Sequence, residues 1–359
     1  MTDQIAARVT REELARFVTA AIRGAGGDTA SADAVTRALV GASLRGVDSH
    51  GVRLLPDYVN VLADGRVKGA PNMRFERRAP GIGYLDADDG LGHLAGYEAV
   101  EHGIALAEET GLAAVTVGRS THYGPAGAYP LEAAERGYIA LSFCNTDKIV
   151  LPFDGQQAFH GTNPMSLAAP VPGQRPYLID MATSAIPWNR VLQFGAIGRP
   201  LPPEVVVDET ATPTQDASIA TALLPLGGAT YGYKGAALAS MVELLCGALT
   251  GVGFSHQVSD GDDRESDFAA PRGLGQFFLV MKPSAFLPQA DYEARIAAYL
   301  ADLRGQPAKT GKTVMAPGDR EWVVEAERGH SGIPIDPAVW EAFATIALRL
   351  GIDPPAALA

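Results

Sequence analysis

The stretch LAAVTVGRSTHYGPAGAYPLEAAERGYIALSFC, residues 112–144, predicts the fold class of the chain. Residues 112–117 and 137–143 are short runs rich in Val, Ile, Leu and aromatic side chains, a composition typical of buried strands. Residues 126–136 between them have the apolar spacing of a helix. A strand, a helix and a second strand in succession indicate an α/β domain.

The alternation continues in both directions along the chain. Further strands are expected in residues 81–87, 175–182 and 275–281, and further helices in residues 96–110 and 236–249. Residues 255–272 are polar and charged, and we expect a surface loop there.

Both ends of the chain are predicted to be helical. Thr10 followed by Glu13 has the spacing of a capping box, and Ser31 is expected to cap a second helix. Asp336 before Pro337 is a typical start for the last helix. These terminal helices are expected to pack on each other or on a partner chain.

Composition narrows the class of protein. The chain has 359 residues, is 47% hydrophobic and carries a formal charge of −12, which indicates an acidic globular protein of two or three domains. An acidic chain without a basic stripe is not expected to bind nucleic acid or an anionic membrane. The first residues have no apolar signal segment, and no apolar stretch reaches membrane-spanning length. Together with the two cysteines Cys144 and Cys246, both in apolar runs, this predicts a cytoplasmic protein with reduced thiols.

Two histidine segments are candidate catalytic sites. The first is Asp48-Ser49-His50-Gly51, and the second is the segment around His122, which follows a predicted strand where α/β proteins bind ligands. Histidine titrates near neutrality and can exchange a proton with a reacting carbonyl or alcohol. From the motifs alone, helix caps and a loop histidine remain open as alternatives. None of the seven histidines has the spacing of a metal-ligand motif, so no metal site is expected.

Other segments suit small-molecule contacts. Gly161-Thr162-Asn163-Pro164 is a turn with a hydroxyl, and residues 180–184 end a strand with small hydroxyl side chains. Lys234 opens the predicted apolar helix, where a lysine and free amides attract phosphate. Glu243 inside that helix is expected to be structural. The sequence contains no GxGxxG motif, so a Rossmann fingerprint does not support nucleotide binding.

Taken together, these segments resemble the malate/L-lactate dehydrogenase family of the second type. This non-Rossmann group includes sulfolactate, ureidoglycolate and diketogulonate dehydrogenases and reductases of piperideine- and pyrroline-2-carboxylate. Eight segments occur in family order: DSHG at 48–51, LDADDGLGH at 85–93, STHYGPAGAY at 120–129, GTNP at 161–164, DMATS at 180–184, YKGAALASMVELLCGALTG at 233–251, APGD at 316–319 and GIPID at 332–336.

The resemblance implies a fold of the sulfolactate-dehydrogenase-like type. This is an α/β fold whose NAD(P)-binding domain has a mixed, non-Rossmann sheet, with helical N- and C-terminal pieces packed together. We expect residues 1–65 and 320–359 to form the helical domain, residues 66–118 and 275–319 the substrate domain, and residues 119–274 the nucleotide-binding domain. Family members are usually homodimers, with the active site between domains and near the partner.

The resemblance also implies roles for individual residues. His50 corresponds to the proton donor with Ser49 as its hydroxyl partner, and His122 to a histidine at the nicotinamide that sometimes has the acid–base role. Thr162 corresponds to a segment near the substrate. The implied cofactor contacts are His122, Tyr123, Gly124, Asp180, Met181, Ala182, Thr183, Ser184, Tyr233, Lys234, Pro317, Gly318 and Asp319.

The chain departs from the family pattern at the substrate-carboxylate clamp. Many relatives have an arginine four residues after the DSHG histidine; this position is Leu54 here, and Arg53 precedes it. After DMATS, Trp188-Asn189-Arg190 stands where relatives tend to have Gly-Lys. Arg53 and Arg190 are therefore the two candidates to bind the substrate carboxylate.

The resulting hypothesis is an oxidoreductase that uses NAD(H) or NADP(H). It would transfer hydride between nicotinamide and the carbon next to the carboxylate of a small 2-oxo or 2-hydroxy acid. The alternative within the family is an NADPH-dependent reductase of piperideine- or pyrroline-2-carboxylate. A remote alternative is a nucleotide-binding protein without catalysis.

Overall fold

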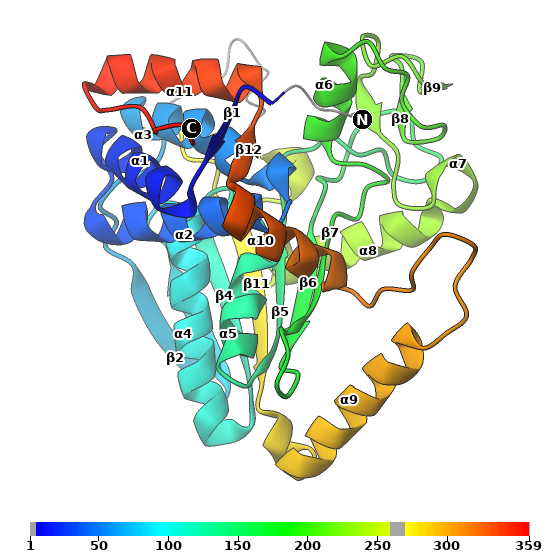
Figure 1. The fold of residues 1–359 in the computed structure, drawn as a ribbon. Coiled ribbons are helices and arrows are strands. Elements are labelled where there is room, and N and C mark those ends of the chain that lie inside the picture. The colour runs from blue at the N-terminus through cyan, green and yellow to red at the C-terminus, as the bar shows by residue number, and fades with distance from the viewer. Residues whose placement is uncertain (1–4, 259–269, 359) are drawn as a thin grey trace.

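A mixed seven-stranded sheet runs through the middle of the molecule, as a computed structural model of residues 5–258 and 270–358 describes it (Figure 1). Strands β3 and β4 pair in parallel, and every other neighbouring pair is antiparallel. In spatial order the strands are β2 (Arg74–Ala79), β3 (Ile82–Asp86), β4 (Leu112–Ser120), β11 (Leu274–Met281), β5 (Ile139–Cys144), β6 (Met165–Ala169) and β7 (Tyr177–Met181). The α/β class and the predicted strands are thus confirmed.

Strand β11 separates β4 from β5, although it follows them by more than a hundred residues. Its sequence LGQFFLVM is apolar along most of its length, as is typical of a strand covered on both faces. Phe278 and Val280 are fully buried within it. The predicted strand–helix–strand unit of residues 112–144 therefore flanks a third strand that comes from late in the chain.

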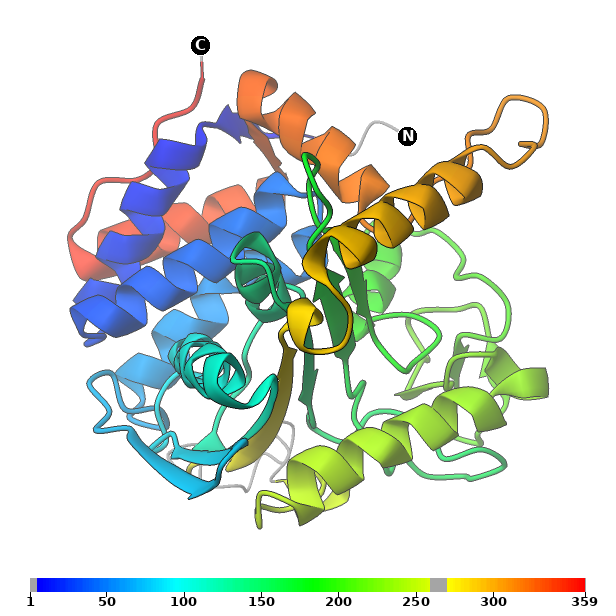
Figure 2. The same cartoon turned by 90° about the horizontal axis from the view of Figure 1, so that it is seen from below.

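Helices cover both faces of this sheet. Helices α4 (Gly92–Thr110) and α5 (Ala128–Glu135) lie on one face, and α8 (Tyr233–Glu243) lies on the other (Figure 2). The prediction of a regular helix through residues 236–249 was wrong in part, because residues Leu244–Ala248 form a π-helix. There the Thr250 hydroxyl donates to the carbonyls of Cys246 and Gly247, which competes with regular helical bonding.

The two chain ends build one helical unit, as predicted. It contains α1 (Arg11–Gly24), α2 (Thr29–Leu44), α3 (Leu55–Ala63) and α11 (Pro337–Leu350), which share one hydrophobic core. Phe17 of α1 lies 5.0 Å from Phe343 of α11, measured between ring centroids. Strand β1 (Ala7–Val9) pairs with β12 (Ile333–Ile335), which ties the ends together a second time.

Helix capping follows the sequence in two of three cases. The side chains of Thr10 and Asp336 accept hydrogen bonds from backbone amides of α1 and α11, as expected. Ser31 does not cap α2, because the Asp28 carboxylate accepts the Ser31 amide at 2.7 Å. Glu13 does not complete a capping box, since its carboxylate pairs with Arg16 instead.

The remaining elements form a smaller unit and a projecting arm. The smaller unit contains α6 (Trp188–Ala196), β8 (Val206–Val207), β9 (Pro213–Thr214), β10 (Ala222–Leu223) and α7 (Gly228–Tyr231). Helix α9 (Gln289–Arg304) extends away from the sheet, and α10 (Asp319–Ser331) leads back to the helical unit (Figure 1). Among the described residues, no helix has the length and apolar character needed to cross a membrane.

We expect Phe343→Ala to loosen the helical unit. Phe343 is 1% exposed, and replacing such a phenylalanine by alanine typically lowers the free energy of unfolding by about 3–5 kcal/mol. Urea unfolding measures the change. The control Phe286→Ala removes a ring that is 65% exposed, and should change stability by less than about 0.5 kcal/mol. Equal effects of the two substitutions would contradict the packing described here.

Candidate functional site

A cavity of about 1510 Å³ lies where the helical unit, the ends of strands β4 and β7, and the start of α10 meet. It exceeds the roughly 300–1,000 Å³ of ordinary small-molecule pockets, so it has room for more than one ligand. Many of the predicted site residues line it: Ser49, His50, His122, Gly124, Thr162, Asp180, Met181, Ala182, Ser184, Pro317 and Gly318.

Two imidazole rings face each other in this cavity. His50 belongs to a 3₁₀ helix, η1 (Asp48–His50), and His122 follows β4. Their ring centroids are 6.1 Å apart and their planes differ by 24°. The chain places these residues 72 positions apart (122 − 50), and the fold brings them together.

Each ring is held through Nδ1 by a hydroxyl group. The Ser49 hydroxyl lies 3.0 Å from Nδ1 of His50, and the Tyr58 hydroxyl lies 2.6 Å from Nδ1 of His122. Within the described part of the chain, neither Nε2 atom has a hydrogen-bond partner, so each remains available to a ligand in the cavity. A hydroxyl donates or accepts, so His50 can carry its proton on either nitrogen, whereas Nδ1 of His122 also accepts the Gly124 amide at 3.4 Å, which places the proton of the neutral ring on Nε2.

Burial keeps both rings neutral at physiological pH. Desolvation lowers the pKa of His50 to about 4. It lowers the pKa of His122 well below the ordinary value, and the nearby His50, His93 and Arg272 lower it further. The pair therefore lacks the charge that an exposed histidine often carries.

A third histidine, His93, packs against the Tyr58 ring that holds His122. His93 is fully buried, and its ring meets the Tyr58 ring edge-on at 4.5 Å. Burial lowers its pKa to about 3, and neither ring nitrogen has a partner among the described residues. Gly124 packs so closely that an added Cβ would lie 2.6 Å from Nε2 of His93, and its φ is +70°. This position therefore requires glycine.

The far end of the cavity contains Asp180 and Arg45. Asp180 accepts the Gly127 amide at 2.9 Å, and desolvation raises its pKa to about 6, although the Gly127 bond and Arg45 oppose the rise. Arg45 directly follows α2, and its side chain makes no ion pair or hydrogen bond with any described residue, although the charges of Glu325 and Asp180 act on it. Burial lowers its pKa, as expected for a cation short of compensating charge.

The GTNP turn presents Thr162 to the cavity and is anchored behind it. Asn163 donates to the Glu243 carboxylate at 2.7 Å, and the Ser255 amide donates to the same carboxylate at 3.1 Å. Glu243 thus has the structural role expected from the sequence. Thr162 receives its own support from Thr146, whose hydroxyl accepts the Thr162 amide.

The structure keeps both predicted carboxylate clamps out of the cavity. Arg53 forms an ion pair with Asp336, the cap of α11. Arg190 is exposed on α6, where it donates to Gln193. Neither residue lines the cavity.

Several predicted cofactor contacts also lie outside the cavity lining. Tyr123 is buried against Tyr129, Thr183 donates to the Thr162 carbonyl, and Asp319 pairs with Arg304. Tyr233 and Lys234 are exposed at the start of α8. None of these five residues lines the cavity, so their roles as cofactor contacts stay predictions.

Among the lining residues that had no predicted role in the site, four have cationic or hydrogen-bonding side chains beside it: Tyr58, Arg45, Arg272 and Asn189. Tyr58 fell on an apolar helical stripe, and Arg45 on a helix end. Arg272 belonged to the predicted loop 255–272, of which residues 259–269 lie outside the described part. Asn189 donates to the Ser49 carbonyl at 3.0 Å and so supports η1. The sequence shows that these side chains are cationic or form hydrogen bonds, but it does not show that they line the cavity.

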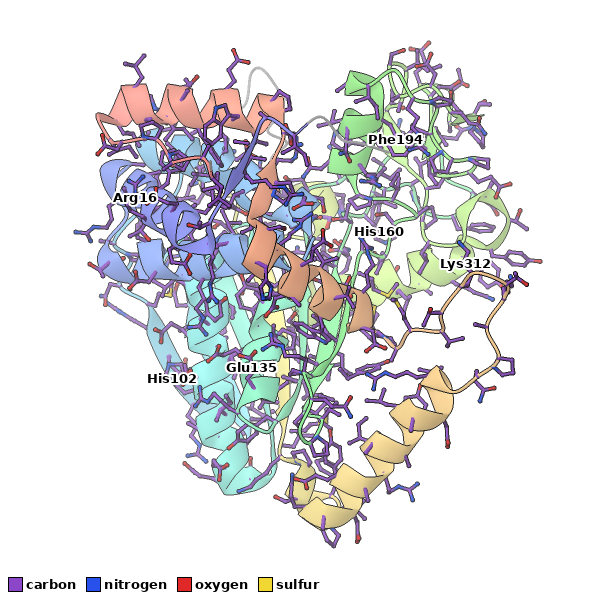
Figure 3. All side chains as sticks on the ribbon, viewed as in Figure 1. Arg16, His102, Glu135, His160, Phe194 and Lys312 are labelled. Carbon is purple, nitrogen blue, oxygen red and sulfur yellow. The ribbon has the colours of Figure 1, made fainter. Side chains whose placement is uncertain are left out.

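Two other histidines lie elsewhere. His102 stacks on Phe75 between α4 and β2, and His160 lies near α8, 3.2 Å from the Ser240 hydroxyl (Figure 3). Among residues 5–258 and 270–358, no three His, Cys, Asp or Glu side chains are grouped to hold a metal ion.

Comparison with known proteins gives matches along nearly the whole chain. The family model described as malate/L-lactate dehydrogenase matches residues 9–344. The structure of malate dehydrogenase from Pyrococcus horikoshii OT3 is 32% identical with a TM-score of 0.87, covering 97% of this chain and 96% of that one. The Δ1-piperideine-2-carboxylate reductase from Pseudomonas syringae pvar. tomato is 31% identical with a TM-score of 0.84, covering 95% and 99%. The (2R)-3-sulfolactate dehydrogenase (NADP(+)) of Chromohalobacter salexigens is 34% identical over 90% of this chain and 93% of its own length.

The low pKa of His50 predicts a pH-dependent stability. Between about pH 6.5, where an unfolded histidine titrates, and pH 4, the unfolded state binds a proton that folded His50 does not. The free energy of unfolding should therefore fall as the pH falls through this range. His50→Gln should lose less stability than the wild type over the same range, because titrations common to both proteins cancel. Urea unfolding at pH 7, 5.5 and 4.5 measures the difference, and parallel curves would refute the assignment.

Proposed function

This chain belongs to the malate/L-lactate dehydrogenase family, and we propose that it interconverts small 2-oxo and 2-hydroxy acids with NAD(H) or NADP(H). The observation that carries the proposal is the histidine pair, whose free Nε2 atoms face a cavity large enough for a dinucleotide and a substrate. Related proteins carry NAD(+) or NADP(+) in their names.

The Asp180 end of the cavity fits a dinucleotide in charge and shape. The Arg45 side chain offers a positive charge that forms no ion pair within the described chain, which suits a phosphate. The Asp180 carboxylate suits ribose hydroxyls, as acidic residues do in other nucleotide sites. Gly127 and Gly318 let the backbone pack closely against Asp180 and Trp322, since an added Cβ would come within 2.7 Å of Asp180 at the first and 3.0 Å of Trp322 at the second.

We assign the nucleotide to this end, with Asp180, Met181, Ala182, Ser184, Pro317 and Gly318 along it and the nicotinamide toward His122. When bound, the nicotinamide supplies or accepts the hydride. The residues of the cavity then need only hold the substrate carbon against the face of the nicotinamide and transfer one proton.

We assign that proton to the histidine pair. His50 is the proposed donor to the substrate oxygen during reduction, with Ser49 holding its Nδ1, and His122 is the second hydrogen-bonding group. The neutral rings do not protonate an oxygen by themselves at neutral pH, given their lowered pKa values. A bound carboxylate and a developing alkoxide both favour the imidazolium, so the ligands raise the pKa of His50 when it must be protonated.

A reductase of cyclic imino acids is the second candidate. Its support is the 31% identity to the piperideine-2-carboxylate reductase over nearly the full length of both chains. The same proton would go to the imine nitrogen. A catalytically silent nucleotide-binding protein is less well supported, because both imidazoles are retained with their Nε2 atoms free.

We further propose that the enzyme is a cytoplasmic homodimer with the domain division expected from its sequence. Leu244 and Leu249 are 62% and 59% exposed after α8, and an apolar surface of this kind suits a partner chain. Tyr233 and Lys234, the expected cofactor contacts outside the cavity, lie on the same helix. Both cysteines are buried free thiols, which suits a reducing compartment.

Substitution of the two histidines distinguishes their role in proton transfer from a role in cofactor binding. His50→Gln and His122→Gln should each lower kcat by about 10²–10⁴-fold, the usual worth of a general acid or base. Cofactor binding, measured by thermal shift with NADH and NADPH side by side, should survive in His50→Gln. Turnover is measured with a panel of 2-oxo acids and cyclic imino acids. Full activity in both variants, or no binding of either nucleotide to the wild type, would contradict the proposal.

Tyr58→Phe tests the hydroxyl that holds His122. The variant keeps the ring that packs on His93 and loses one hydrogen bond, so kcat should fall roughly 2- to 10-fold with KM unchanged. The ¹⁵N resonance of Nδ1 of His122 should move, which a purely structural defect would not cause. Tyr292→Phe, which also loses one hydrogen bond but on α9, is the matched control. An unchanged Nδ1 resonance in Tyr58→Phe would exclude a positioning role.

A further inference from the structure

The histidine end of the cavity lacks the expected carboxylate clamp. Leu54 lines the cavity at the position where many relatives have arginine, and it is 8% exposed. Its neighbour Arg53 is directed to Asp336 and does not line the cavity. A 2-oxo acid bound between the histidines therefore needs another cation.

Arg272 is the cation at this end. It lines the cavity, and its Nη1 atom donates to the Asp147 carboxylate. Its Nε atom is buried and has no partner within the described chain. Its charge acts on His122 and on Asp57, which places it close to His122. An arginine with one N–H edge engaged keeps another edge for a planar carboxylate.

The other cations that line the cavity interact with other groups. Arg45 acts on Asp180, at the nucleotide end. Arg66 and Lys148 also line the cavity, and both already have interactions with other groups. Arg272 is thus the described cation best suited to meet an acid beside His122.

Apart from Lys148, the lining near Arg272 is apolar or acidic. Val47, Leu54, Ile149, Ile186 and Trp188 line the cavity. Asp57 and Asp147 add two carboxylates near Arg272. A second carboxylate on the substrate would meet repulsion from these two groups, while Arg45 lies at the nucleotide end and Lys148 already interacts with another group.

We propose that Arg272 binds the substrate carboxylate, and that Leu54 and its apolar neighbours select 2-oxo monocarboxylates with an apolar side chain over dicarboxylates. This inference rests on the proposed function and names its substrate class. Leu54 is a specificity residue in it, because an arginine there would offer the second carboxylate its missing partner.

Steady-state kinetics of the wild type test the selectivity. With whichever nucleotide binds, kcat/KM for 4-methyl-2-oxopentanoate should exceed that for oxaloacetate by at least about 10-fold, the cost of one unpaired charge contact. Equal or better use of oxaloacetate would overturn the selectivity.

Substitution of Arg272 tests the carboxylate contact. Arg272→Gln should raise KM for 4-methyl-2-oxopentanoate by about 10- to 100-fold, since a charge-assisted hydrogen bond is lost. The KM of Arg272→Lys for this acid should lie between those of Arg272→Gln and the wild type. KM for the methyl ester of the same acid, which has no carboxylate, should change little. Arg136→Gln, which removes an exposed arginine paired with Glu101, is the matched control. An unchanged KM for the acid in Arg272→Gln overturns the assignment.

Failure of the proposed function has a different signature. If the wild type turns over no 2-oxo acid or cyclic imino acid with either nucleotide, the enzymatic proposal fails. Equilibrium binding of 4-methyl-2-oxopentanoate, measured by thermal shift in the presence of the nucleotide, still tests Arg272. A stabilisation that is lost in Arg272→Gln and kept in Arg136→Gln supports the contact, and equal stabilisation in both refutes it.

Discussion

The hydrogen bond between the Tyr58 hydroxyl and Nδ1 of His122 connects the two halves of the site. Tyr58 comes from α3, in the helical unit built by both chain ends, whereas His122 follows β4 of the central sheet. The 2.6 Å bond therefore joins the helical unit to the sheet at the point where the cavity forms, and α2 packed on α4 joins them a second time. His50 belongs to the same helical unit, so the geometry of the histidine pair depends on the contacts that Tyr58 of α3 makes with His93 and His122. Phe17 and Phe343, far from any ligand, contribute to the packing of α3 through the shared helical core.

The site combines strong desolvation with hydroxyl partners. A carboxylate partner would stabilise a charged imidazole and fix the proton on Nδ1, as it does in other histidine sites. Ser49 and Tyr58 do neither, because a hydroxyl group accepts or donates with similar ease. The rings thus remain neutral without ligands. An imidazolium formed when ligands bind would give its Nε2 proton to the substrate during reduction, and the neutral ring would take the proton back at Nε2 during oxidation. This property suits an enzyme whose direction is set by its substrates and nucleotide pool.

Local sequence patterns predicted most of the fold, and contacts between distant segments account for what they missed. The strands and helices of residues 112–144 have clear periodicity, and Thr10 and Asp336 cap helices because the cap depends on neighbouring residues only. The insertion of β11 between β4 and β5 has no local signal, since it depends on which strand edges are free after folding. The same limit applies within the site. Arg53 carries the correct charge close to the correct position, but Asp336, 283 residues away, takes its guanidinium. Tyr58 looked like one more apolar-face residue, because nothing adjacent to it in the chain marks its hydroxyl as functional.

Burial keeps the two histidines of the cavity neutral, and the charge of Arg272 adds to this effect at His122. The Arg45 side chain forms no ion pair with a described residue, although Asp180 and Glu325 act on its charge, and Arg272 donates to Asp147 through one Nη atom. Protonated His50 and His122 would add two more cations within the same poorly solvated space, and mutual repulsion there is costly. Before ligands bind, neutral imidazole rings therefore avoid repulsion with the arginines of the cavity. A dinucleotide and an acid bring negative charge to both ends of the cavity, and the cost of protonating His50 falls as they bind. Ligand binding and proton uptake are therefore coupled in this site, which allows the acid to form when a substrate is present to receive its proton.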